Sequence, residues 1–540
     1  AVWSNGDPVT ASDFVWAWKR MLTPSLGSKY PDMLYDVVNA EEFNREYSSC
    51  GTNKEDPCDG DVTFSIEAND DSTINVTDIS HRAAKNGFVT FRDTKSLGGN
   101  ITAEVLNQEY QIASITNENV YTIEAKDAVG NIVKTNSEDI GKGGSKVIAV
   151  YRSIKDFTKV GIKALGPKTL VVQIRNRAPY FLGLLCHYTT RPVHRPTIEK
   201  FGDIDSIGSK WTRPGNFIGN GPFTLEEWKL NKILKVKKNK LYWDANKVRL
   251  NEIHFWPVDN ASREDKMFRS GQLHVTSTVP PEKVDVYFKE YPDLIRSDPW
   301  YGTYYLRINV QKKAFENKLI RQALSLSIDR KEIVENVMKG GQAPAFSFTP
   351  PDPNSYYPST FLNYDPKLAR SLLEEAGFSS ENFPTFELLY NTSEGHQKLA
   401  QAIQQMWKEN LNIDVQLTNT DWKVYLSRQS IGDYSIARAG WIGDYVDPKT
   451  FLDMMVTGRG NNQTGWSNSE YDDLLVKAAQ SPSQDERFKN FYKAEKILID
   501  ELPIIPIYTY TRIYMLNQDV KGWSPNLLDT HPYQFVYLER

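Results

Sequence analysis

The chain has 540 residues, and its 64 Lys and Arg against 68 Asp and Glu give a formal net charge of −4 with all seven His neutral. This balance argues against a nucleic-acid-binding protein, which would show a basic excess or stripe, and no stretch approaches the ~18 apolar residues of a membrane-spanning helix. The 13 Trp, 28 Tyr and 24 Phe favour a polar cleft lined by rings in a chain of about three or four domains.

The first 46 residues have the pattern of a turn followed by a helix. Thr10 and Asp13 stand as an N-cap and N3 pair, and an apolar periodicity follows them. The chain opens without an initiator Met or an apolar leader, on a strand end that runs into Asn5-Gly6-Asp7-Pro8. We therefore expect a further segment upstream of Ala1.

Residues 47–155 have a different hydrophobic pattern. Apolar residues alternate with period two, as in Val62, Phe64 and Ile66, and turn pairs such as Asn86-Gly87 separate the short strands. No convincing helical pattern interrupts this run. The pattern predicts an all-β module inserted into an otherwise α/β chain.

Helices and strands mix from residue 156 onward. Asp365-Pro366 begins a helix that Gly377 ends, residues 396–410 are amphipathic, and a long helix over 484–501 leads into an apolar strand at 504–508. Elements in this order predict two α/β lobes.

The three cysteines differ in setting. Cys50 and Cys58 bound a short polar loop; a disulfide there would imply an oxidising compartment, and two free surface thiols are the alternative. Cys186 lies in the apolar run Leu184-Leu185-Cys186 and is expected to be a small buried residue.

Signatures of catalysis are missing from the sequence. It has no Gly-x-Ser-x-Gly elbow, no His-Glu-x-x-His and no Walker loop. Cys186, His187 and His194 match no zinc spacing. We therefore expect a protein that is not an enzyme and that has no metal site and no cofactor.

Several segments resemble, in their order along the chain, the periplasmic oligopeptide-binding proteins of bacterial ABC importers (OppA type, solute-binding protein family 5). These segments are Trp3–Ala11, Asn220-Gly221-Pro222-Phe223, Tyr242-Trp243-Asp244, Phe386–His396 and Ala437–Tyr445. The resemblance covers about 1–46 and 156–540. It implies an α/β, two-lobed periplasmic-binding-protein-like fold of type II and the large peptide-binding class, with an inserted all-β module.

The resemblance also implies a division into domains. The expected parts are a small accessory domain of 1–46 and 156–199, the inserted module of 47–155, lobe I of 200–301 and 511–540, and lobe II of 302–510. Lobe I is expected to be incomplete, because its N-terminal part is missing. The insert has no counterpart in the family, and its residues 80–91, 97–101 and 110–112 resemble β modules of phage virion and tail proteins.

The family's ligand is a zwitterion with a backbone that can pair as a strand. The resemblance implies that Ala439, Gly440, Ile442 and Gly443 pair with the peptide and that Asp444 receives its ammonium group. That charge-assisted hydrogen bond is worth about 1.5–3 kcal/mol. From the residues alone, Asp444 could equally be a turn residue before a proline.

Three cations match the family's residues that meet peptide carboxylates of different lengths, namely Arg438, His396 and Lys339. Each has a plainer interpretation: an internal ion-pair residue for Arg438, a helix-start cap for His396, and a helix C-terminal cation for Lys339. An unperturbed imidazole is mostly uncharged at neutral pH, so His396 is expected to contribute least.

Two tryptophans, Trp441 and Trp422, match residues that line side-chain pockets in the family, and ordinary core packing is the alternative. Some family members carry a pair of cysteines at positions that are Gly302 and Ile442 here. Both cysteines are absent together, as a lost disulfide would leave them, so the alignment of this chain with the family still holds.

The function implied by the resemblance is that of the substrate-binding component of an ABC importer. It would be a monomer, periplasmic or lipid-anchored at the outer face of the cell membrane, which captures short peptides between its lobes and passes them to a permease in the inner membrane. Two alternatives stay open. One is a binder of dipeptide, murein peptide or another small solute, and the other is a surface or virion-associated adhesion protein that acts through the β insert.

Overall fold

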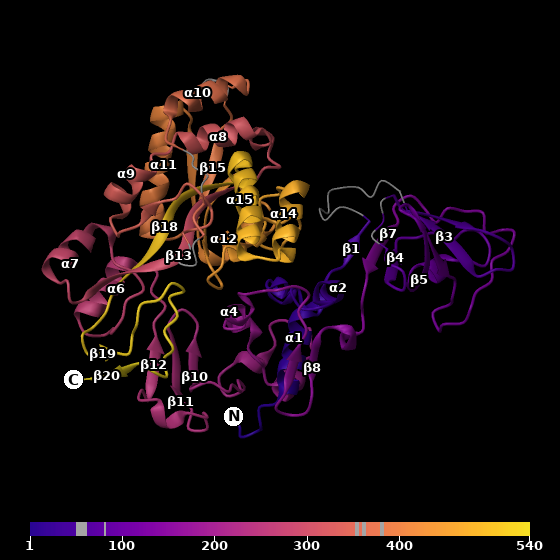
Figure 1. Cartoon of the computed structure of the whole chain (residues 1–540), viewed down its shortest axis with the longest axis horizontal. Helices are drawn as coiled ribbons and strands as arrows, with labels where there is room; N and C mark the ends of the chain where they lie inside the picture. Colours follow the sequence, from indigo (N-terminus) through magenta and orange to yellow (C-terminus); the bar gives the residue numbers. More distant parts are fainter. Residues whose placement is uncertain are drawn as a thin grey trace. The chain divides into compact units, whose positions relative to one another are not determined.

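The computed structural model describes residues 1–49, 62–79, 81, 83–351, 356–358, 363–378 and 383–539 (Figure 1). These residues form two compact units: the larger unit holds 1–9, 176–197 and 210–540, and the smaller unit holds 10–175 and 198–209. The finer division into an accessory domain, an insert and two lobes stays a prediction. Cys50 and Cys58 lie outside the described residues, so their pairing stays a prediction as well.

The smaller unit begins with the predicted helix, α1 (Ala11–Leu22). Its Thr10–Asp13 capping box is present, and Trp16, Trp18 and Met21 are buried. Helix α2 (Ala40–Asn44) and the hairpin of β8 (Ile162–Ala164) and β9 (Leu170–Val172) lie against it. Helix α5 (Arg195–Phe201) starts in the larger unit and ends in the smaller one.

A seven-stranded antiparallel sheet forms the rest of this unit, in the order β1-β7-β4-β5-β6-β3-β2. The strands are β1 (Tyr47–Ser48), β2 (Thr63–Ile66), β3 (Thr73–Thr77), β4 (Phe88–Arg92), β5 (Glu109–Asn117), β6 (Val120–Glu124) and β7 (Ile148–Arg152). Alternate residues such as Phe64, Val76 and Tyr121 are buried in one core. The predicted all-β module is confirmed, with one four-residue helix, α3 (Ala103–Leu106), inside it.

The larger unit is built on a six-stranded sheet in the order β14-β18-β13-β17-β15-β16. Its strands are β13 (Ile295–Ile308), β14 (Ala343–Pro344), β15 (Phe386–Asn391), β16 (Val415–Thr420), β17 (Ile436–Ile442) and β18 (Ile504–Met515). Strand β15 runs parallel to β16 and β17, and the other pairs are antiparallel. The predicted strand at 504–508 is the start of β18.

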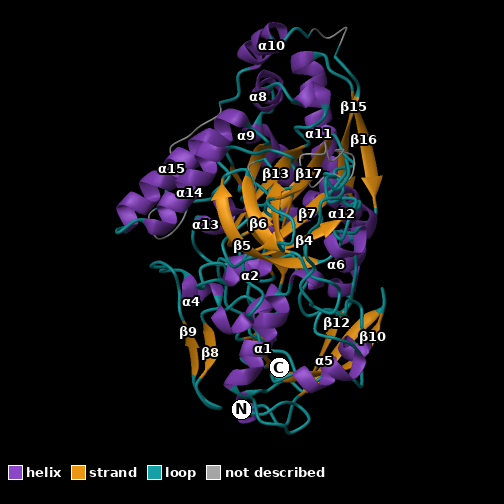
Figure 2. Ribbon diagram, turned by 90° about the vertical axis from the view of Figure 1, so that its right-hand side faces the viewer, coloured by secondary structure: helices purple, strands orange, loops and turns teal. Residues whose placement is uncertain are grey.

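Helices cover both faces of this sheet, so its central strands are apolar on both sides. Along β13, Tyr304 and Leu306 pack in the core that holds α8 (Lys318–Leu326), α10 (Pro366–Glu375) and α11 (Glu394–Leu411). Tyr301 and Tyr305 alternate with these residues and point to the opposite face of the sheet. They pack against α14 (Ser469–Gln480) and α15 (Gln484–Glu501), which Figure 2 shows on one side of the sheet. The three predicted helices are confirmed as α10, α11 and α15.

The larger unit also holds further helices and strands. They are α4 (Phe181–Leu184), β10 (Phe223–Lys229), β11 (Ile233–Lys238), β12 (Glu252–Phe255), α6 (Ala261–Arg269), α7 (Val284–Glu290), α9 (Arg330–Glu332), the π-helical turn η9 (Ile333–Met338), α12 (Trp422–Ser430), α13 (Lys449–Leu452), β19 (Val520–Lys521) and β20 (Tyr537–Leu538). Strands β10, β11 and β12 form a three-stranded antiparallel sheet.

Two residues singled out in the sequence are placed by this fold. Gly302 and Ile442 are directly opposite on β13 and β17, and a Cβ added at Gly302 would lie 2.4 Å from Ile442 Cδ1. The two positions are thus adjacent, as a cysteine pair would need. The burial predicted for Cys186 is wrong: the residue is exposed after the single turn of α4, and its thiol meets the Leu182 carbonyl at 3.5 Å.

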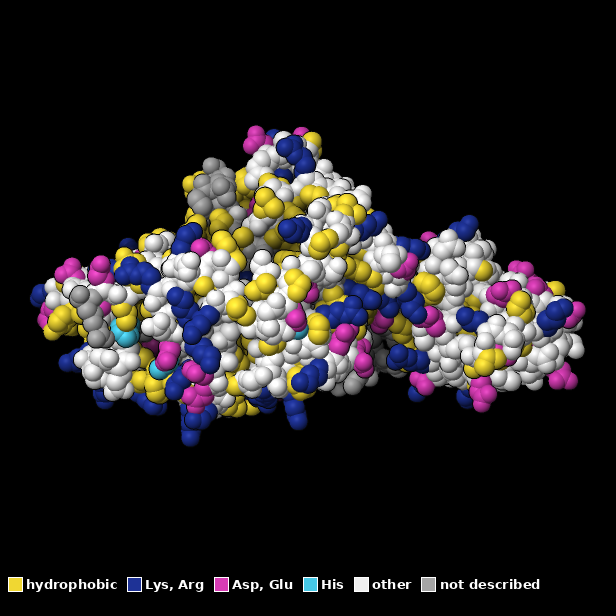
Figure 3. All heavy atoms as spheres, turned by 90° about the horizontal axis from the view of Figure 1, so that it is seen from below, with side chains coloured by type: hydrophobic (Ala, Val, Ile, Leu, Met, Phe, Trp, Pro, Cys, Tyr) yellow, Lys and Arg dark blue, Asp and Glu magenta, His cyan; other side chains and the backbone are white. Residues whose placement is uncertain are grey.

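Charged side chains of both signs share the surface. On the face shown in Figure 3, Lys and Arg lie among Asp and Glu and do not separate into one basic area. None of the helices in the described part of the chain has the length and apolar character needed to span a membrane.

Candidate functional site

Strand β17 has one edge that is only partly paired. Residues Ile436–Ile442 pair with β13 on one side, whereas on the other side β15 pairs only with Ile436 and Ala437. Among the described residues, no strand pairs with 438–442 on that second side. An unpaired strand edge presents a row of backbone donors and acceptors that another chain can join.

The register with β13 tells which backbone groups face the open side. The Gly443 N–H donates to the Tyr301 carbonyl at 2.8 Å, and in an antiparallel pair the bonded residues alternate. Gly440 and Ile442 therefore point their N–H and C=O groups away from β13. A Cβ at Gly440 would lie 2.3 Å from the Tyr510 hydroxyl, so this position has no room for a side chain.

Arg438 lies at the start of the open edge and is partly buried. Its Nε donates to Asn391 Oδ1 at 2.7 Å, and its guanidinium lies 5.3–5.9 Å from the ring centres of Tyr425, Trp422 and Tyr304. Among the described residues, no carboxylate comes within ion-pair distance of it. The guanidinium is therefore a positive charge without a counter-ion, in a setting where a ligand carboxylate would be bound strongly.

His396 lies near the start of α11, close enough to Arg438 for the guanidinium to act on its ring. Its ring centre is 5.7 Å from that of Tyr304. Burial, together with the Arg438 guanidinium, holds the pKa of His396 well below its usual 6.5. The imidazole is therefore neutral at physiological pH and offers a hydrogen bond rather than a charge.

Lys339, the third predicted cation, has a partner of its own. It follows η9 in the left-handed conformation, with φ 58°. Its Nζ lies 3.0 Å from Asp285 Oδ2 of α7, and both side chains are well exposed. The structure thus brings Arg438 and His396 together and places Lys339 in an ion pair with Asp285.

Asp444 lies just beyond the other end of β17. Its N–H donates to Thr450 Oγ1 at 3.0 Å, and its Oδ1 lies 3.3 Å from His187 Nε2. The two side chains are only 14% and 9% exposed. A second acid in this turn, Asp447, is instead neutralised by Arg487 through contacts of 2.5 and 2.9 Å.

His187 is a site residue that the sequence reasoning missed. The sequence places it only in a possible metal cluster with Cys186 and His194. In the structure it faces Asp444, while His194 contacts Asp7 at 3.0 Å. No signal in the sequence joins residues 187 and 444, because the contact depends on how a distant segment packs beside β17.

The two predicted tryptophans lie in different settings. Trp422 is 54% exposed and stacks on Tyr425 at 5.5 Å. Trp441 packs against the core that contains Tyr301 and Tyr305, and its indole N–H is buried without an acceptor among the described residues. Ala439 is buried beside it. Trp422 thus lies near Arg438, whereas Trp441 is partly buried against the core, and its role in a pocket stays a prediction.

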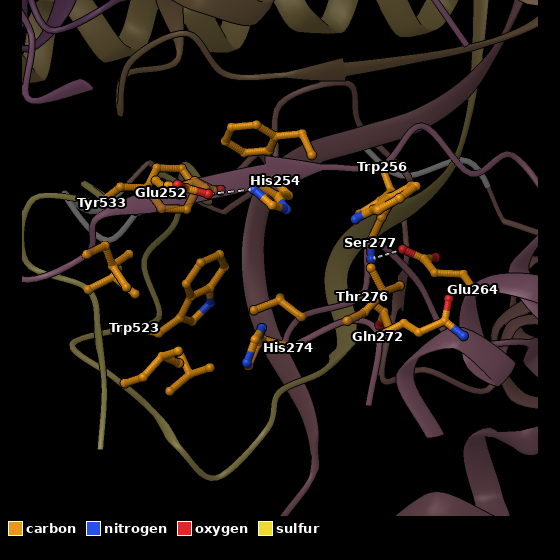
Figure 4. A pocket seen from close by; sticks show the side chains of 18 of the residues that line it. Glu252, His254, Trp256, Glu264, Gln272, His274, Thr276, Ser277, Trp523 and Tyr533 are labelled. Carbon is orange, nitrogen blue, oxygen red and sulfur yellow. Dashed lines mark hydrogen bonds and ion pairs between the residues drawn. The ribbon is translucent and has the colours of Figure 1, made fainter. Parts of the chain in front are cut away.

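A cavity of about 480 Å³ lies elsewhere in the larger unit, beside β12 (Figure 4). Aromatic side chains, among them Trp256, Trp523 and Tyr533, line much of it. Burial raises the pKa of Glu264 in its wall, whose carboxylate accepts a hydrogen bond from the Ser277 N–H at 2.5 Å. The side chains predicted for ligand binding are not among those that line this cavity.

Comparison with known proteins places these features in a family. The sequence pattern of the bacterial extracellular solute-binding proteins, family 5 (middle region), matches residues 1–93 and 122–463. The periplasmic oligopeptide-binding protein OppA of Salmonella typhimurium is 35% identical over 392 residues, which are 71% of this chain and 70% of that protein.

Solved structures agree with this match. Haemophilus influenzae OppA in complex with the peptide RPPGFSPFR has a TM-score of 0.74 and 28% identity, with 100% of this chain and 85% of that chain covered. A periplasmic oligopeptide-binding protein of an oligopeptide ABC transporter from Borrelia burgdorferi also has a TM-score of 0.74 and 28% identity, with 100% and 86% covered. The two-lobed type II fold, with an additional β sheet, is thus confirmed. The chain belongs to the bacterial extracellular solute-binding proteins of family 5.

Proposed function

We propose that this chain is the substrate-binding component of an ABC importer and that it binds short peptides along the open edge of β17. One observation carries the proposal. A strand edge that no strand of the described residues pairs is flanked by two charges, Arg438 and Asp444. Within the described part of the chain, Arg438 has no carboxylate partner and the Asp444 carboxylate contacts His187 alone. The named relatives, which are oligopeptide-binding proteins, support the same ligand class.

The charges fix the direction of the peptide. Its ammonium group meets Asp444 and its carboxylate lies toward Arg438, so the peptide runs antiparallel to β17. The six residue-to-residue steps from Arg438 to Asp444 span at most about 20 Å at ~3.3 Å per step. A ligand of a few residues fits this span, with Gly440 and Ile442 supplying the backbone bonds of an added strand.

The carboxylate end has further donors. Burial raises the pKa values of Tyr304, Tyr425 and Tyr510 around Arg438, so these phenols keep their protons and can donate to a ligand carboxylate. Because the recognised groups are backbone and termini, side chains of the ligand are tolerated, and water completes the contacts around them.

Ligand exchange requires the two lobes to move, and the long strands β13 and β18 are the proposed hinge. They pair over 295–299 with 511–515 and again over 303–307 with 504–509, and the register is irregular between Pro299 and Thr303. A break in the ladder at this point lets the strands bend without losing the pairs on either side.

Blocking the termini of the peptide tests the proposal. Isothermal titration calorimetry compares a free tri- to pentapeptide with its N-acetylated and C-amidated forms. Each block removes one charge-assisted hydrogen bond, worth about 1.5–3 kcal/mol, so each costs at least about tenfold in affinity. Equal affinity for free and blocked peptides would show that the termini are not recognised.

The finer parts of the functional assignment rest on the same relatives. The name of one relative supports a periplasmic location, and that of another an oligopeptide ABC transporter. We propose in addition a monomer, periplasmic or lipid-anchored at the outer face of the cell membrane, that delivers its ligand to a permease without chemical change. Recovery of intact peptide after long incubation tests the absence of catalysis. A competition panel of dipeptides, murein peptide and oligopeptides tests the ligand class, and sedimentation tests the monomer.

A further inference from the structure

The turn that follows β17 is contacted by residues 176–197, a segment far upstream in the sequence. Tyr180 stacks on Tyr445 with ring centres 5.3 Å apart and planes 16° apart. Lys449 Nζ and Arg487 Cζ each lie 5.0 Å from the centre of the Tyr180 ring. These contacts fix the segment against the turn that follows β17, and His187 is carried on it.

The ring of His187 is held in one orientation. It lies at the start of the turn Tyr188–Thr190, where its Nδ1 accepts from the Thr189 N–H at 3.5 Å and lies 2.9 Å from Thr189 Oγ1. The centre of its ring is 4.1 Å from that of Tyr188. With Nδ1 used as an acceptor, the ring carries a proton on Nε2, the atom that faces Asp444.

The contact leaves half of the carboxylate free. His187 Nε2 meets Oδ1 of Asp444 at 3.3 Å, and no donor among the described residues reaches Oδ2. Asp447, three residues on, has both of its oxygens taken by Arg487. Asp444 is thus held through Oδ1, and its Oδ2 has no donor among the described residues.

We infer that His187 is a positioning residue for the ammonium group of the ligand: it holds Asp444 so that Oδ2 faces the open edge of β17. This inference rests on the proposed peptide-binding function. A carboxylate that is fixed before the ligand arrives loses less side-chain freedom on binding, so the free ligand binds more tightly.

The test compares trialanine with N-acetyl-trialanine on His187→Ala, by calorimetry. The substitution is expected to lower the affinity for trialanine about tenfold and to leave the affinity for the acetylated peptide within twofold, because only the first peptide uses Asp444. His187→Gln, whose side-chain amide can donate from a similar position, is expected to recover most of the loss.

His194→Ala is the matched control, because it removes another His–Asp contact, with Asp7, that involves no residue of β17. It should leave the ratio of the two affinities unchanged. An equal loss for both peptides in His187→Ala would make His187 a structural residue, and tighter binding of trialanine would make it a competitor for Asp444; either result overturns the inference. Absence of trialanine binding by the unaltered protein would instead refute the proposed function.

Discussion

The two ends of β17 hold opposite charges in different ways. At one end, Arg438 is enclosed by aromatic rings and donates to Asn391, on the adjacent strand β15. At the other end, Asp444 follows the strand in a turn and contacts His187, which comes from a segment far away in the sequence. The cation is positioned by strand register, and the acid is positioned by a long-range contact.

This difference indicates which end of the site can change its affinity for a ligand by substitution. Register in a sheet buried on both faces is strongly specified, so the surroundings of Arg438 follow from the fold itself. The orientation of Asp444 depends on a docked segment, and changes in that segment can alter it while the sheet stays intact. We expect substitutions to affect the two ends separately, and blocked peptides to report which end has changed.

The largest effect is expected from Asp444→Asn. The substitution keeps the shape of the side chain and removes the charge, which leaves the buried ammonium group of a bound peptide without a counter-ion. Loss of one partner of a buried charge pair costs about 2–5 kcal/mol, and we expect about a 100-fold loss for free peptides with no loss for N-acetylated ones, measured by calorimetry.

Asp414→Asn is the matched control for this experiment. It makes the same chemical change at an exposed acid that pairs with Lys408, and it should leave both affinities unchanged. If Asp444→Asn weakens free and acetylated peptides alike, then Asp444 supports the turn rather than the ligand.

A smaller loss, about 30-fold, is expected from Arg438→Met for peptides with a free carboxylate, since the nearby phenols can still donate to the ligand. Stability should move the other way. Because Arg438 is a partly buried charge without a counter-ion among the described residues, its removal is expected to leave the melting temperature unchanged or to raise it. Calorimetry and thermal unfolding on the same variant measure both. A fall in melting temperature together with affinity would identify Arg438 as a structural residue.

Local patterns in the sequence predicted much of this molecule. The capping pair Thr10–Asp13, the Asp365-Pro366 start of α10 and the period-two alternation within 47–155 each depend on a few neighbouring residues, and all three are found in the structure. Such signals survive because the local preference and the tertiary fold agree.

Contacts between distant segments could not be predicted in the same way. Cys186 looked buried because its neighbours Leu184 and Leu185 are apolar, yet the single turn of α4 leaves it exposed. Only tertiary packing brings His187 beside Asp444 and places Asp285 within ion-pair distance of Lys339. The family resemblance predicts the candidate site residues, whereas the residues that they contact are known only from the structure.

His396→Gln is expected to change affinity less than threefold at pH 7.5, because the imidazole beside Arg438 is neutral there. The pH dependence of stability is the more sensitive measurement. The folded state keeps the pKa of His396 well below 6.5, whereas the unfolded chain takes up a proton near pH 6.5. Protonation of His396 therefore favours the unfolded chain. The free energy of unfolding falls for this reason as the pH drops below about 6.5. Urea unfolding at several pH values should show that the free energy of unfolding falls less at acid pH in His396→Gln than in the unaltered protein. An unchanged pH profile would contradict the assigned burial.

The smallest effect is expected from Lys339→Met. The ammonium group of Lys339 already has Asp285 as its partner, and its side chain is 37% exposed, so solvent and salt screen its field. We expect less than a twofold change in affinity at 0.15 M salt for tri-, tetra- and pentapeptides. Lys398→Met is the matched control, because Lys398 has a similar exposure and pairs with Glu282 at 2.7 Å. A loss above tenfold confined to one peptide length would mean that Lys339 leaves Asp285 to bind the carboxylate of that ligand, and the cation end would then extend beyond Arg438.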